Sequence, residues 1–125
     1  MEDHLPLPKE IGPHEGIEFD LMQDGLKNVA MFTDYIPSEA DEIIQRNNFH
    51  VIKLKRDFDG REFFTTIIYR DGFSDLAKEL SDIIKSEPSS FDPVIERRIG
   101  ELLSYSDTEI DVYIAFHLSK MRQVP

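Results

Sequence analysis

Two runs of alternating apolar and polar residues flank one turn-forming dipeptide near the middle of the chain. Residues 49–58 lie before Asp59-Gly60, and residues 61–69 lie after it. An Asp-Gly pair accepts the positive φ values of a tight type I′ turn, so the pattern predicts an antiparallel hairpin over residues 49–69. Apolar residues become more frequent on both faces toward the open end of this hairpin, which indicates that helices cover both faces there. The expected cross-strand pairs are Phe58 with Arg61, Lys55 with Phe64, Leu54 with Thr65, Lys53 with Thr66, Ile52 with Ile67, Val51 with Ile68 and His50 with Tyr69.

Three helices are expected after the hairpin, because apolar residues recur there at the spacing of one helix face. Ser74 is placed to cap the first, Asp92 with Pro93 opens the second, and Ser106 with Glu109 forms a capping box for the third. The stripes expected to face the core are Leu76, Leu80, Ile83 and Ile84 in the first helix, and Ile95, Ile99, Leu102 and Leu103 in the second.

The part of the chain before the hairpin is less regular. Residues 14–24 fit a short helix that buries Ile17, Leu21 and Met22 and ends at Gly25. The alternation of apolar residues with acids in the same segment also fits a strand, and the pattern leaves both open. Residues 29–33 are an apolar run typical of a buried strand, and Ser38 is placed to cap a short helix after it.

These elements together predict an α+β fold. We expect a small, mainly antiparallel sheet of about three strands, with the hairpin at its centre and four or five helices covering it. Residues 1–13 contain three prolines and are predicted to form an extended arm. Residues 14–125 are predicted to form a single globular domain.

Composition excludes several kinds of chemistry. The chain of 125 residues has no cysteine, which removes disulfide frameworks, thiolate metal sites and cysteine nucleophiles. No apolar run approaches the roughly 20 residues that a membrane-spanning helix needs, and the first residues lack the features of a signal peptide. We therefore expect a cytoplasmic protein that does not bind membranes.

Charge is distributed unevenly along the chain. The net charge is −11, of which residues 1–45 carry −9, whereas residues 46–70 carry +3. The overall field repels phosphate backbones, so general nucleic-acid binding is not expected. The basic residues of the hairpin, with Phe58 and Phe64, resemble a single-strand binding surface in composition, but lysines on an exposed strand also protect a sheet edge from aggregation. The excess of acids in the first 45 residues is more than solubility needs and indicates a partner with a basic surface.

Two small groups of residues are candidates for catalysis or metal binding. His14 and Glu18 would lie one turn apart on a helix, as metal ligands do, with Glu15 available as a base. First-turn acids that complement the helix dipole explain the same residues. His50 and Tyr69 are expected cross-strand neighbours that could act as an acid–base pair, or form a structural contact in the sheet.

The function that fits this sequence best is a small acidic module, binding or inhibitory but not catalytic, that engages a basic protein surface through its acidic N-terminal third. Nucleotide-binding loops and nucleophile motifs are absent from the sequence, and no cofactor is expected. The alternative is a small enzyme or ligand-binding domain with a pocket around His50 and Tyr69, or with a metal at His14 and Glu18. The acids expected to contact the partner are Glu15, Glu18, Asp20, Glu39, Asp41 and Glu42.

Overall fold

A computed structural model describes residues 14, 16–86 and 92–122 of the chain. The predicted arm over residues 1–13 and the candidate residue Glu15 lie outside these described residues. Among the helices that are described, none combines the length and the apolar character needed to cross a membrane.

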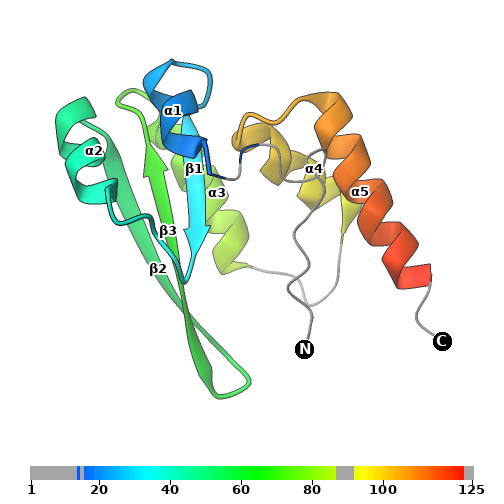
Figure 1. Ribbon diagram of the computed structural model, residues 1–125. Helices are drawn as coiled ribbons and strands as arrows, with labels where there is room; N and C mark the ends of the chain where they lie inside the picture. The colour runs from blue at the N-terminus through cyan, green and yellow to red at the C-terminus, as the bar shows by residue number, and fades with distance from the viewer. Residues whose placement is uncertain (1–13, 15, 87–91, 123–125) are drawn as a thin grey trace.

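The described residues form five helices and one three-stranded antiparallel sheet with the strand order β1-β3-β2 (Figure 1). This arrangement confirms the predicted α+β fold with a hairpin at its centre. The elements in chain order are α1 (Glu18–Gln23), β1 (Val29–Thr33), α2 (Ala40–Asn47), β2 (His50–Phe58), β3 (Arg61–Tyr69), α3 (Ser74–Lys85), α4 (Pro93–Leu102) and α5 (Asp107–Arg122).

The β2–β3 hairpin has the register that the sequence predicts, and every expected cross-strand pair is present. Asp59 and Gly60 both have positive φ, at 52° and 77°, as a type I′ turn requires. Strand β1 pairs only with residues 65–69 of β3. The turn half of the hairpin therefore extends past β1 as a two-stranded ribbon, as Figure 1 shows.

Helices cover both faces of the sheet at the end where β1 joins it. On one face, α1 and α2 pack over Ala30, Phe32 and Ile68 (Figure 1). On the other face, α3 packs over Val29 and Ile67, α4 packs against α3, and α5 packs against α4. Alternate residues of β1 thus belong to different cores, which explains why this short strand is apolar along almost all of its length.

Of the segment 14–24, the described residues (14 and 16–24) contain a helix and no strand. Helix α1 ends at Gly25, whose φ of 79° fits the left-handed exit expected there. The core side of α1 is only partly as predicted. Met22 is buried, but its buried partner is Phe19, and Ile17 is 43% exposed.

The two later cap predictions are confirmed. The Asp92 carboxylate accepts a hydrogen bond from the Val94 amide at 2.9 Å, with Pro93 in the first turn of α4. Ser106 and Glu109 make the reciprocal bonds of a capping box at the start of α5. These three hydrogen bonds between side chains and backbone amides fix where the two carboxy-terminal helices begin.

The cap predictions at Ser38 and Ser74 are wrong. Glu39 and Phe73 occupy the N-cap positions of α2 and α3, and neither makes a side-chain cap hydrogen bond. Each serine is displaced from the N-cap by one residue, so its hydroxyl is not at the position from which it would bond to a free amide of the first turn.

Candidate functional site

The clearest candidate for a binding site is a groove of about 490 Å³ between α1, β1 and α2. The first turn of α1 forms one wall, and the β1–α2 connection forms the other. The described residues that line this groove are Gly16, Glu18, Phe19, Asp20, Met31, Phe32, Thr33, Tyr35, Pro37, Glu39 and Ile43.

The floor of the groove is apolar and belongs to the protein core. Phe19, Phe32 and Ile43 line it, and each is at most 8% exposed. The rings of Phe19 and Phe32 are packed together, with centroids 5.6 Å apart. Because these side chains are held by the core beneath them, the floor is a preformed apolar surface.

Three carboxylates surround this floor. Glu18 and Asp20 come from α1, and Glu39 lies at the start of α2 on the opposite wall. No lysine, arginine or histidine occurs among the described residues that line the groove. The negative potential in the groove is therefore not neutralised by a cation in its own lining.

One exposed aromatic side chain lines the groove, and a second lies on β3 opposite the turn that follows β1. Tyr35 lines the groove and is 69% exposed, and Phe64 on β3 is 51% exposed. Asp34 holds the turn that carries Tyr35 against β3. Its amide donates to the Phe64 carbonyl at 2.7 Å, and its carboxylate accepts from the Phe64 amide at 2.9 Å. Exposed aromatic rings beside a charged rim are typical of protein-binding surfaces.

The acids that the sequence predicts to contact a partner fall into two groups in the structure. Glu18, Asp20 and Glu39 meet at the groove, although they are separated by up to 21 positions in the chain. Asp41 and Glu42 lie on exposed parts of α2 and do not line it. Glu42 forms an exposed ion pair with Arg46, one turn further along the same helix, at 3.2 Å.

The two metal-ligand candidates have other partners. Glu18 accepts a hydrogen bond from the Gly16 amide at 3.0 Å. The His14 Nδ1 atom lies 2.8 Å from the Lys27 Nζ atom, and its ring stacks on Tyr105 with centroids 4.0 Å apart. Within the described part of the chain, no group of three or more histidine, aspartate or glutamate side chains is arranged to hold a metal ion.

Lys27 is the most unusual residue of this region, because its side chain is only 2% exposed. Its ammonium group donates to the Leu103 carbonyl, at the end of α4, and lies 4.9 Å from the centre of the Tyr105 ring. The carbonyls at the end of a helix have no partners within it and carry partial negative charge. Lys27 therefore joins the sheet half of the molecule to the carboxy-terminal helices.

Burial governs the protonation of this cluster. It lowers the pKa of Lys27 to about 8, against the opposing attraction of Glu18 and Glu109. Burial, with the nearby Lys27 ammonium, lowers the pKa of His14 to about 4. Near neutral pH, Lys27 is thus mostly charged and His14 is neutral, so His14 can accept the lysine proton in a hydrogen bond.

His50 and Tyr69 are cross-strand neighbours as predicted, with ring centroids 5.2 Å apart. The His50 side chain is 42% exposed, and its Nε2 atom lies 2.9 Å from a carboxylate oxygen of Asp71. Neither residue lines the groove. An exposed histidine beside an aspartate at the end of a strand is typical of a structural contact on the surface of the sheet.

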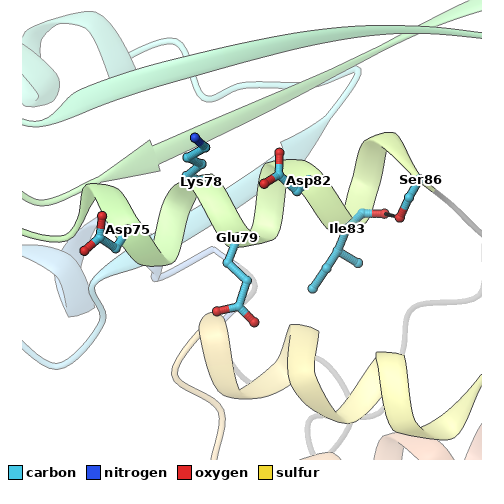
Figure 2. Close-up of a pocket in the computed structure, with 6 residues that line it drawn as sticks. All are labelled: Asp75, Lys78, Glu79, Asp82, Ile83 and Ser86. Carbon is cyan, nitrogen blue, oxygen red and sulfur yellow. Dashed lines mark hydrogen bonds between the residues drawn. The ribbon is translucent and has the colours of Figure 1, made fainter.

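A second hollow, of about 530 Å³, lies along α3, and its described lining residues come from that helix and its C-cap alone (Figure 2). Asp75, Asp82 and Lys78 project from this surface. Glu79 points toward α4 in Figure 2, where both of its oxygens bond to the Arg98 guanidinium at 2.6 and 2.7 Å. This hollow is a mixed-charge helix surface and lacks the buried apolar floor of the groove.

Comparison of the chain with protein-family models, with curated proteins and with solved structures gave no match. The evidence for function is therefore the geometry of the groove itself. Sequence reasoning missed its aromatic floor and the buried Lys27. The sequence held one signal for the buried lysine, since Lys27 is the only lysine or arginine between positions 10 and 45.

Proposed function

We propose that this protein is a non-catalytic binding or inhibitory module that takes a basic segment of a partner protein into the groove between α1, β1 and α2. One observation carries the proposal: Glu18, Asp20 and Glu39 surround an apolar floor, and no described lining residue is basic. A groove of this kind favours a ligand that is cationic at one end and apolar along its length.

Lysine and arginine side chains have this chemistry. Their aliphatic stems cover apolar surface while the charged head stays near water or a carboxylate. In the groove, the stem would lie on Phe19 and Phe32, and the head would reach Asp20 or Glu39. Rim charges of this type contribute about 0.2–1 kcal/mol each, and they also accelerate association at low salt.

A short peptide of alternating lysine and valine tests the proposal. Binding, followed by fluorescence anisotropy of the labelled peptide, should weaken as salt is raised from about 50 to about 300 mM, because added ions screen the rim charges. The double variant D20N/E39Q should bind about threefold to tenfold more weakly, as expected for the loss of two rim charges.

The matched control is D75N/D82N, which removes the same number of charges from the α3 surface shown in Figure 2. This variant should bind the peptide as the unmodified protein does. Equal losses in the two variants would mean that the peptide responds only to net charge, and the groove would then not be the binding site.

The alternative of a small enzyme has less support. His50 is exposed and paired with Asp71, and His14 is held between Lys27 and Tyr105. A cytoplasmic location and the lack of general nucleic-acid binding remain predictions from the absence of cysteine and from the net charge of −11.

A further inference from the structure

Strand β1 is an edge strand, and half of its backbone hydrogen-bonding groups point away from the sheet. The Asp34 amide donates to the Phe64 carbonyl, so in this register the even-numbered residues of β1 bond to β3. In an antiparallel pair, the odd-numbered residues of β1 then direct their N–H and C=O groups to the side away from β3. Met31 and Thr33 therefore point their backbone N–H and C=O groups away from β3. None of these groups is hydrogen-bonded to another described residue.

This free edge coincides with the acidic groove. Met31 and Thr33 line the groove together with Phe32, whose side chain forms part of the floor. The outward amides and carbonyls, the apolar floor and the carboxylates of Glu18 and Glu39 therefore meet in one place. An extended peptide is the ligand that uses all three, because it supplies backbone groups and alternating side chains together.

The opposite edge of the sheet is protected in a way that β1 is not. By the same alternation, the residues of β2 that face outward are Val51, Lys53, Lys55 and Asp57. Charged side chains, lysine above all, discourage other strands from pairing with an edge. β1 has the sequence Val-Ala-Met-Phe-Thr and carries no charge.

We propose that an extended basic segment of a partner protein adds to β1 as a fourth, outer strand of the sheet. The inference rests on the proposed function and specifies the form of its ligand. The added strand bonds to the outward groups of Met31 and Thr33, and its lysine or arginine side chains on the groove side lie near Glu18, Asp20 and Glu39. A basic partner is favoured over segments of this chain, because residues 1–13 contain three acids and one lysine and the whole chain carries −11.

Substitution of Thr33 by proline tests the strand pairing without changing any charge. Thr33 makes no ladder bond to β3, so proline there removes an outward amide and leaves the sheet pairing in place. T33P should bind the lysine–valine peptide at least tenfold more weakly. The matched control V51P removes an outward amide from β2 and should bind the peptide as the unmodified protein does.

N-methylated peptides test the same inference with the unmodified protein. One version is methylated on the backbone nitrogens of its lysines and the other on those of its valines. Because alternate amides of a strand point to opposite sides, one version should bind within about threefold of the parent and the other at least tenfold more weakly. Equal binding of both versions would overturn the strand pairing.

The outcomes separate this inference from the proposed function. If D20N/E39Q weakens binding but T33P and both methylated peptides bind normally, the groove binds basic segments without strand addition. If neither charge removal nor T33P has an effect, both proposals fail. If the protein self-associates and T33P abolishes this self-association, a second copy of the chain occupies the β1 edge. That result would overturn the inference that the partner is a different protein.

Discussion

The buried Lys27 gives a prediction whose size follows from the structure. Its pKa is lowered from 10.5 to about 8 in the folded protein, because the side chain is almost completely removed from water. At pH values between these two pKa values, Lys27 is mostly protonated in the unfolded chain and mostly deprotonated in the folded protein. The free energy of unfolding therefore rises with pH in this range. The full shift corresponds to about 3 kcal/mol, and about 2 kcal/mol of it should be gained between about pH 7.5 and about pH 9.5.

The variant K27M isolates this effect, because methionine keeps the unbranched apolar stem and cannot titrate. At neutral pH two effects oppose each other: the penalty for burying the charge disappears, but the Leu103 carbonyl and His14 lose their donor. An unsatisfied buried group costs about 1–3 kcal/mol, so the net change near pH 7.5 should be small. The difference between the two proteins should then grow with pH, in favour of the unmodified protein.

Urea unfolding followed by circular dichroism at about pH 7.5, 8.5 and 9.5 measures this difference directly. Other titrating groups cancel when the variant is subtracted from the unmodified protein. The control is K78M on α3, which makes the same substitution at an exposed lysine. If K27M and the unmodified protein keep a constant difference over this range, Lys27 is not buried as a titrating group, and the reasoning is refuted.

Three further predictions concern stability. Protonation of His14 should remove about 3 kcal/mol of stability as pH falls from about 6.5 toward 4, because the folded pKa of His14 lies near 4 and its stabilisation is complete only above the unfolded value. The difference in free energy of unfolding between the unmodified protein and H14Q, measured in urea, should shift by that amount over this range, and a constant difference would contradict the prediction. G100A should destabilise the fold by about 1–3 kcal/mol, since a Cβ atom there would lie 2.7 Å from a side-chain carbon of Ile110. The same change should cost less in an I110A background, where that carbon is absent, and equal stability of G100A and the unmodified protein would contradict the close helix packing. D92A should cost about 1 kcal/mol in thermal or urea unfolding through loss of the α4 cap, and no loss would mean that Pro93 alone fixes the helix start.

The parts of the fold that follow from short-range rules were predictable from the sequence. The hairpin register depends on the Asp59-Gly60 turn and on cross-strand alternation, and both signals lie within 21 consecutive residues. The starts of α4 and α5 depend on side chains that bond within three positions along the chain. At α2 and α3 the same reasoning was wrong by one residue, because another residue took the N-cap position.

The groove was less accessible to sequence reasoning. Its walls come from α1 and the β1–α2 connection, and they meet only because both pack on the same face of the sheet. The acids could be listed from the sequence, but nothing local separates Asp20, which lines the groove, from Asp41, which does not. Lys27 was missed for a related reason: a lysine is almost always exposed, and only the distant Leu103 carbonyl and the Tyr105 ring make its burial possible.

Amide chemical shift mapping shows directly whether the groove between α1, β1 and α2 binds basic segments. The ¹⁵N-labelled protein is titrated with the lysine–valine peptide, and a glutamate–valine peptide serves as the control. We expect the largest shifts at Gly16, Asp20, Thr33 and Tyr35, which all line the groove, and no shifts with the control peptide. Largest shifts on α3 or α5, or equal responses to both peptides, would contradict this prediction.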